Sequence, residues 1–170
     1  VRLIENRDLY GIDQMIAMMI ALKEMKVDLK LVVYLISMQN RSSSELKHYK
    51  ELDQKIGQAG LHDRILLYES TNEEFFPLIS MADIMLRPTW SDGFGISILE
   101  AFDFGKPVIA SDCVQRQPGC TLFEAGDTIS FAQTVERVLA NYPKEVDSVK
   151  SLNRPDYGGQ LLEIYSSFSQ

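Results

Sequence analysis

The chain has 170 residues, of which 45% are hydrophobic and 24% are charged, and its formal net charge is −7. This length and composition are typical of one globular domain of the soluble type, or at most two small ones. The acidic balance argues against a nucleic-acid-binding surface, which needs clustered lysine and arginine, so we expect no nucleic acid partner.

The two cysteines, Cys113 and Cys120, have no Cys-x-x-Cys spacing, and the two histidines are not clustered. We therefore expect neither a disulfide framework nor a zinc site. Reduced thiols favour a cytoplasmic location. The sequence has no charged leader followed by an apolar core, and no apolar run of about twenty residues, so it indicates neither secretion nor a membrane span.

Apolar patterns predict strands and helices that alternate along the chain. Continuous apolar runs predict strands at 29–36, 64–68, 84–87 and 108–110, a brief strand at 121–123, and the end of a first strand at 1–4. Helical spacing predicts helices at 12–25, 46–59 and 129–139, a short helix ending at 81, a surface helix within 141–155, and a last helix containing 161–168. Because the run at 29–36 is not one-sided, we expect that strand to be covered on both faces.

Capping residues mark the starts of three of the predicted helices. Ser42 and Glu45 have the spacing of a capping box, and so do Thr71 and Glu74. Asp127 can cap the helix that follows it.

Strands that alternate with helices through short connections predict an α/β fold, a doubly wound parallel sheet with helices on both faces. In such folds ligands bind beyond the carboxyl ends of the strands. No internal repeat, low-complexity tract or linker interrupts the pattern, so residues 1–170 are interpreted as a single domain.

The most informative stretch runs from Met85 to Ser111 and predicts a strand, a glycine-bearing loop, a helix and another strand. Pro88 has no amide hydrogen, so the strand must end there. Gly93 and Gly95 flank Phe94 and allow the backbone to adopt a positive φ or to approach a ligand closely. Free amide groups at the start of the following helix would make a ready anion site.

Glu100 lies one turn after Ile96, the first residue of this predicted helix, and its neighbours are mostly apolar. A carboxylate in such surroundings needs a partner. The helix is expected to end at Gly105, and Pro107 prevents its continuation into the next strand.

This stretch resembles the donor-binding signature of the family 4 retaining glycosyltransferases (glycosyl transferases group 1), which have the GT-B fold. The two acids of the signature are eight positions apart here, as the paired glutamates of the family are. The matching residues are Pro88-Thr89, Asp92-Gly93-Phe94-Gly95, Glu100-Ala101 and Gly105-Lys106-Pro107-Val108. The alternative interpretation is an ordinary strand–loop–helix unit of an α/β domain.

The resemblance implies that residues 1–170 are the donor-binding C-terminal half of a GT-B enzyme, with a Rossmann-like fold, and that the N-terminal acceptor domain is absent. The implied activity is transfer of a hexose-type sugar, with retention, from a nucleotide diphosphate sugar to a glycan, lipid or other acceptor, as in polysaccharide biosynthesis. No cofactor and no metal are expected. The isolated chain is expected to have little transfer activity, and peripheral membrane attachment of the whole enzyme is left open.

The resemblance also implies roles for individual residues. Glu100 stands where the family's second glutamate accepts hydrogen bonds from the vicinal ribose hydroxyls. Asp92 stands where the first glutamate contacts the donor sugar near the reacting centre, although aspartate is one methylene shorter. The backbone amides expected to face the sugar and the diphosphate belong to Gly93, Phe94, Gly95 and Ile96.

Near the N-terminus the match is looser. Arg2 corresponds to an arginine that grips the diphosphate in the family, and Gly11 corresponds to the glycine before the first helix. The lysine that shares this task is replaced by Tyr10. Arg7, in the intervening loop, is either a substitute for that lysine or a solvated loop residue.

Two other functions fit parts of the sequence. The departures at Tyr10 and Asp92 allow a non-catalytic module that binds a nucleotide or sugar phosphate on the same fold. A signalling receiver domain would need an acidic cluster at the end of the first strand, where only Glu5 and Asp8 are found.

Overall fold

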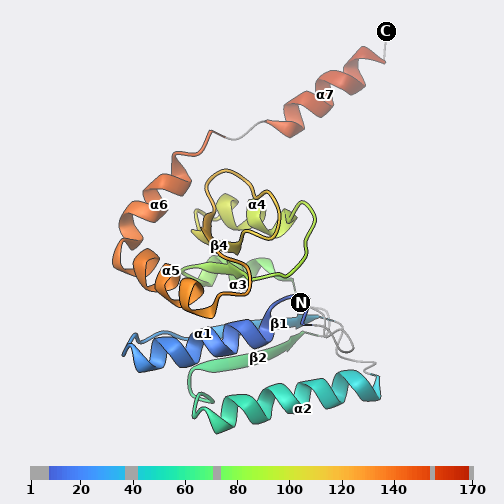
Figure 1. The fold of residues 1–170 in the computed structure, drawn as a ribbon. Coiled ribbons are helices and arrows are strands. Elements are labelled where there is room, and N and C mark those ends of the chain that lie inside the picture. Colours follow the sequence, from blue (N-terminus) through green and yellow to red (C-terminus); the bar gives the residue numbers. More distant parts are fainter. Residues whose placement is uncertain (1–7, 37–41, 71–73, 154–155, 169–170) are drawn as a thin grey trace.

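The computed structural model describes residues 8–36, 42–70, 74–153 and 156–168 (Figure 1). Helices and strands alternate along most of the chain, as predicted. Their bounds are α1 Ile12–Glu24, β1 Leu31–Ile36, α2 Ser43–Gln58, β2 Ile65–Ser70, α3 Phe76–Met81, β3 Met85–Arg87, α4 Ile96–Asp103, β4 Val108–Ser111, β5 Thr121–Phe123, α5 Thr128–Ala140, α6 Tyr142–Lys150 and α7 Tyr157–Ser167.

The strands form two parallel sheets within the described residues. β1 pairs with β2, and β4 lies between β3 and β5 in a sheet of three strands. The doubly wound order puts the first strand of the fold in the middle, the second and third on one side, and the fourth to sixth on the other. The two observed sheets correspond to those two sides. The first strand end predicted at 1–4 lies outside the described residues.

Helices cover both faces of β4, whose four residues are all buried. Because side chains alternate across a strand, Ile109 packs into one core while Val108 and Ala110 pack into another. The Ile109 core is formed with α1, α2 and α5, and it includes the stacked rings of Phe123 and Phe131, whose centroids are 4.1 Å apart. The second core is formed with α3, α4 and α6.

The expectation that the strand at 29–36 is covered on both faces was wrong. Val33 and Leu35 are buried, whereas Val32 and Ile36 on the opposite face are exposed, as is Leu66 on β2. The second core, which covers the corresponding face of the other sheet, contains no residue of β1 or β2.

The predicted helix caps that fall within the described residues are confirmed. Ser42 and Glu45 form a complete capping box at the start of α2. Asp127 accepts hydrogen bonds from the amides of Ile129 and Ser130 at the start of α5. Thr71, which was predicted to cap a helix with Glu74, lies outside the described residues.

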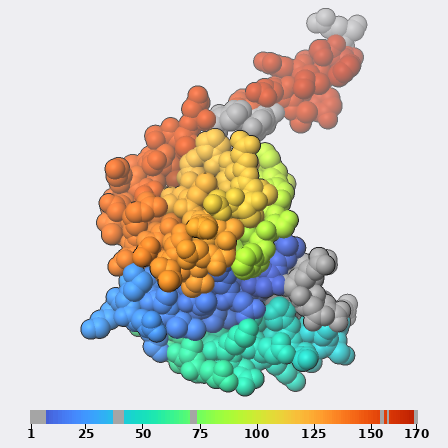
Figure 2. Space-filling model, in the orientation of Figure 1, coloured from blue at the N-terminus to red at the C-terminus, as the bar shows by residue number. Residues whose placement is uncertain are grey.

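The last helix, α7, stands away from the rest of the chain (Figures 1 and 2). Its large apolar side chains are exposed: Leu161, Leu162, Ile164 and Tyr165, followed by Phe168. Within the described part of the chain, no helix has the length and apolar character needed to cross a bilayer.

Candidate functional site

The predicted site is formed by the loop between β3 and α4, residues 88–95, which we call the motif loop. Gly95, the residue before α4, is in the left-handed region, with φ of 70°, so a side chain at this position would be strained. Gly93 does not have a positive φ, and the space around it is open. Of the two glycines, only Gly95 is therefore required by its backbone conformation.

Asp92 is held by two arginines. Arg87 donates through Nε to Oδ2 at 2.5 Å and through Nη2 to Oδ1 at 2.7 Å, so this contact is bidentate. Arg116 donates through Nη1 to Oδ2, also at 2.5 Å. The hydroxyl of Thr89 and the amide of Gly93 are further donors to the carboxylate, at 3.2 and 2.9 Å. The side chain of Asp92 is 9% exposed, so this is a nearly buried ion cluster.

Burial by itself raises the pKa of Asp92, but the hydrogen bonds from Arg87 and Arg116 outweigh it and hold the pKa well below its ordinary value. The hydrogen bond to Asp92 also raises the pKa of Arg87 above its ordinary value. Asp92 is therefore ionised at neutral pH, and the cluster of two cations and one anion carries one net positive charge.

Arg116 is the buried centre of this cluster, with its side chain only 2% exposed. Besides Asp92, its guanidinium donates to the hydroxyls of Thr89 at 2.8 Å and Ser111 at 3.1 Å, and to the carbonyl of Ser111 at 2.8 Å. It also donates to Sγ of Cys113 at 3.3 Å. The arginine thereby joins the motif loop to the end of β4 and the loop that follows.

Further hydrogen bonds join the same two loops. The hydroxyl of Ser111 donates to the carbonyl of Thr89 at 2.6 Å, and the side-chain amide of Gln117 donates to the carbonyl of Phe94 at 3.3 Å. The motif loop is thus fixed at its beginning, middle and end.

On its other side, the motif loop rests against the segment that leads into α1. The amide of Trp90 donates to the carbonyl of Leu9 at 3.1 Å. Gly11 packs against Pro88 so closely that an added Cβ would lie 1.9 Å from the Pro88 carbonyl oxygen. The φ of Gly11 is also positive, at 71°.

Replacing Gly11 with alanine is expected to lower the free energy of unfolding by about 3 kcal/mol, because the new side chain adds a backbone clash to a strained φ. Urea denaturation followed by circular dichroism measures this change. Gly93→Ala is the matched control, since its Cβ meets open space, and it is expected to change stability by less than about 0.5 kcal/mol. Equal effects of the two substitutions would contradict the packing described for Gly11.

The first amides of α1 are already occupied by a side chain of the protein. Oδ1 of Asp8 accepts from the amide of Ile12 at 2.6 Å, and Oδ2 accepts from the amide of Asp13 at 3.0 Å. Burial raises the pKa of Asp8, against the opposing effect of the bond from Ile12. An anion that enters this region has freer amides at the start of α4 than at the start of α1.

Glu100 is half-buried on α4, one turn after Ile96. In the described part of the chain, its carboxylate makes no hydrogen bond or ion pair. The two acids of the signature thus differ, because Asp92 is fully engaged by protein donors whereas Glu100 is available to accept hydrogen bonds from a ligand.

One loop and the helix that follows it contain six of the predicted site residues: Asp92, Gly93, Phe94, Gly95, Ile96 and Glu100. Three large apolar side chains of this region are exposed: Trp90, Phe94 and Ile96. The remaining predicted site residues, Arg2 and Arg7, lie outside the described residues.

Sequence reasoning missed Arg87 and Arg116. Arg87 had a usable signal, since it is a charged residue at the end of an apolar strand and lies five positions before an acid. Arg116 had none, because it lies in a polar loop and reaches Asp92 only through the pairing of β3 with β4.

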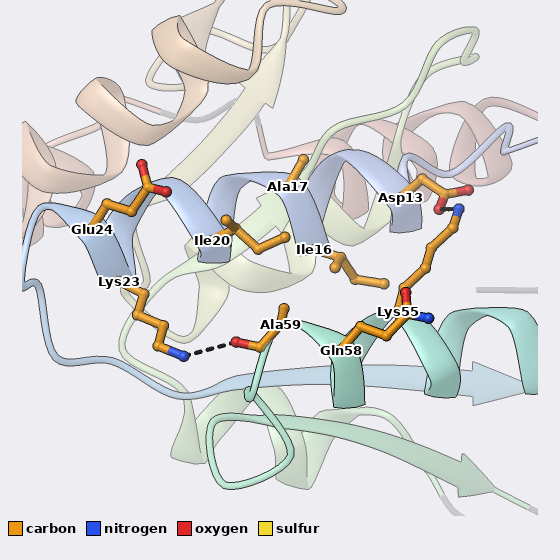
Figure 3. A pocket seen from close by; sticks show the side chains of 9 residues that line it. All are labelled: Asp13, Ile16, Ala17, Ile20, Lys23, Glu24, Lys55, Gln58 and Ala59. Carbon is orange, nitrogen blue, oxygen red and sulfur yellow. Dashed lines mark hydrogen bonds and ion pairs between the residues drawn. The ribbon is translucent and has the colours of Figure 1, made fainter.

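Away from the motif loop, a concave surface lies between α1 and α2 (Figure 3). The ion pair of Lys55 with Asp13 lies at one end, and at the other Lys23 donates to the carbonyl of Ala59 at 2.7 Å. The apolar side chains of α1 lie between these contacts. No residue of the motif loop lines this groove, and three of its charged residues, Asp13, Lys23 and Lys55, are engaged by one another or by the backbone, so we assign it no ligand.

Comparison with known proteins gives a consistent result. Residues 3–141 match the family described as glycosyl transferases group 1. A segment of 63 residues is 33% identical to the alpha-D-kanosaminyltransferase of Streptomyces kanamyceticus, and it spans 36% of this chain but only 16% of that protein.

Solved structures have the same fold. The C-terminal domain of a group 1 family glycosyl transferase from Francisella tularensis matches with a TM-score of 0.68 and 22% identity, over 87% of this chain and 76% of that one. An Anabaena protein in complex with UDP-glucose matches with a TM-score of 0.66 and 19% identity, over 87% of this chain and 40% of that one. The predicted α/β, Rossmann-like fold is confirmed.

The family match covers most of the chain, including every residue of the motif loop and Glu100. The chain therefore belongs to the glycosyl transferases group 1 family.

Proposed function

We propose that this chain binds the nucleotide diphosphate sugar of a retaining glycosyltransferase, which transfers a hexose-type sugar to a glycan, lipid or other acceptor. The observation that carries the proposal is the half-buried carboxylate of Glu100, which has no partner in the described part of the chain although it lies beside a glycine-bearing loop and a helix start. Vicinal hydroxyls of a ribose are suitable partners, because each can donate a charge-assisted hydrogen bond to the carboxylate.

In this assignment the ribose lies at Glu100 and the diphosphate lies at the start of α4. The amides of Gly95 and Ile96 and the positive end of the helix dipole favour negative charge there. The same groups stabilise the charge that grows on the leaving diphosphate as the bond to the sugar breaks. Asp92 is assigned to the donor sugar, and the proposal includes no metal or other cofactor.

We further infer that residues 1–170 are the donor half of a two-domain enzyme and that a separate N-terminal domain supplies the acceptor site. The match to a separately solved C-terminal domain supports this division. The exposed side chains of Trp90, Phe94 and Ile96 also fit a surface that faces a cleft. Both cysteines, Cys113 and Cys120, are free thiols, in keeping with a cytoplasmic location.

Calorimetric titration of the chain with UDP, GDP and ADP, and with their hexose conjugates, tests the proposal. One base is expected to bind in preference to the others, and its sugar conjugate is expected to bind at least as tightly as the diphosphate alone. Because the proposal includes no metal, adding EDTA should leave the affinity unchanged. Failure of all these nucleotides to bind would contradict the proposed function.

A non-catalytic module that binds a nucleotide or sugar phosphate is the second candidate, and the engagement of Asp92 by two arginines favours it. A carboxylate that only supports the loop needs no contact with a sugar. Joining the chain to a native N-terminal domain and assaying sugar transfer separates the candidates. Transfer supports the enzyme, whereas nucleotide binding without transfer supports the module.

A further inference from the structure

In the family that the chain resembles, a lysine before the first helix helps to bind the diphosphate. Tyr10 occupies that position here, so this positive charge is missing. In the structure, Arg87 lies near that position. Tyr10 lies between Leu9, whose carbonyl accepts from the amide of Trp90, and Gly11, which packs against Pro88, the residue that follows Arg87. The cation that is missing from the segment before α1 is therefore available in space from the end of β3.

Arg87 also lies at the start of α4, where the diphosphate is assigned. A Cβ built on Gly95 would be 3.4 Å from Nε of Arg87, and Nη1 of Arg87 donates to the hydroxyl of Ser97 at 2.8 Å. A guanidinium has five N–H groups, and the contacts to Asp92 and Ser97 use three of them. Two N–H groups remain for an anion, and guanidinium binds phosphate oxygens in a bidentate manner.

The surroundings of Asp92 show which contact can be exchanged. A carboxylate offers about four lone-pair sites, and five donors already approach that of Asp92. It can accept a sugar hydroxyl only if one donor leaves. Arg116 is 2% exposed and bonded to several other groups, whereas Arg87 is 20% exposed and supplies two of the five donors. Arg87 is the donor that can turn toward a ligand.

We propose that Arg87 is the cation that binds the donor's diphosphate, in place of the lysine absent at Tyr10, and that Asp92 is its counter-ion in the empty site. When the diphosphate engages Arg87, Asp92 keeps its bonds from Arg116, Thr89 and Gly93, and it gains capacity to accept a hydroxyl of the donor sugar. This inference rests on the proposed function, and it names a residue for one part of the donor.

The test compares diphosphate, monophosphate and nucleoside. Calorimetry on the chain uses UDP, UMP and uridine, and the corresponding guanine and adenine series, so that the preferred base is included. The wild-type chain is expected to prefer the diphosphate to the nucleoside. In Arg87→Gln, the affinity for the diphosphate should fall on the order of tenfold to a hundredfold, while the affinity for the nucleoside stays the same. Arg87→Lys, which keeps the charge, should recover part of the loss.

Asp92→Asn provides a second measurement that does not depend on the stability of the Arg87 variants. This substitution removes the negative charge of Asp92, which competes with the diphosphate for the Arg87 guanidinium. The diphosphate is therefore expected to bind at least as tightly as it does to the wild type. Arg64→Gln is the matched control, because Arg64 is a partly exposed arginine paired with Asp28 beside β2. It should leave all affinities unchanged.

The outcomes separate this inference from the proposed function. If no nucleotide binds to the wild type, both are overturned. If nucleotides bind, and Arg87→Gln either leaves the diphosphate affinity unchanged or weakens diphosphate and nucleoside equally, only the role of Arg87 is overturned. Weaker diphosphate binding in Asp92→Asn would also contradict it.

Discussion

Replacing Glu100 with alanine is expected to weaken binding of the preferred nucleoside diphosphate on the order of a hundredfold or more, and replacing it with glutamine about tenfold. Two charge-assisted hydrogen bonds to the ribose are lost with alanine, each contributing about 1.5 to 3 kcal/mol. Glutamine keeps one acceptor oxygen but loses the charge. Because Glu100 makes no hydrogen bond or ion pair within the described residues, these losses arise from the ligand and not from the fold.

The 2′-deoxy analogue of the same nucleotide makes this prediction sharper. Wild-type protein should prefer the ribonucleotide, and the preference should disappear in Glu100→Ala because the hydroxyl has no acceptor in that variant. Isothermal titration calorimetry measures both ligands. Glu163→Ala on α7 is the matched control, since it makes the same chemical change at an exposed site away from the motif loop. A retained preference for ribose in Glu100→Ala would remove the central residue of the proposed site.

Replacing Arg116 with methionine is expected to lower the free energy of unfolding by about 3 kcal/mol at neutral pH. The variant leaves the nearly buried carboxylate of Asp92 with one guanidinium in place of two, and breaking a buried charge pair costs more than the pair contributes when intact. The hydroxyls of Thr89 and Ser111 also lose a donor. Urea denaturation with an unchanged m-value measures the effect.

The same variant should show a defined pH dependence. The folded-state pKa of Asp92 is depressed in the wild type, so its stabilising contribution is present above the ordinary carboxyl pKa of 3.8 and is lost as the pH falls toward the folded value. The difference in stability between wild type and Arg116→Met should therefore shrink below about pH 4. Arg137→Met, at a more exposed and longer pair with Glu145, should cost less than about 1 kcal/mol. A cost for Arg116→Met as small as this would contradict the buried cluster.

Much of the fold could be predicted because local signals and long-range packing agree. The helical spacing after Gly11, the capping box at Ser42 and the cap at Asp127 each depend on neighbouring residues in the sequence, and all three appear in the structure. The β-strands were found from apolar runs, with bounds that differ by one or two residues.

The burial of β1 could not be predicted in the same way. An apolar run shows that a strand can be buried on both faces, but a second layer of helices must then be present to cover it. In this chain that layer covers β4 and leaves Val32 and Ile36 exposed. Which strand receives the layer is decided by the packing of helices distant in sequence, and the run itself carries no information about it.

For the site, sequence reasoning identified the acids but not the arginines that distinguish them. Glu100 and Asp92 were both recognised from their spacing, and the role of each remains a prediction. Whether a carboxylate is free or engaged depends on groups from other loops, and Arg116 is 24 positions from its partner. The spacing of the acids predicts which side chains can share a site. The hydrogen bonds in the structure are needed to tell which of those side chains already have partners within the protein.

The attachment of the motif loop on both sides has a thermodynamic consequence. Bonds from Arg116, Ser111 and Gln117 on one side, and the contacts with Leu9 and Gly11 on the other, restrict the loop before any ligand arrives. Its conformational entropy is therefore lost when the chain folds and not when a donor binds. Differences in binding entropy among related nucleotides should then reflect the ligands and their displaced water, with little contribution from ordering of the protein.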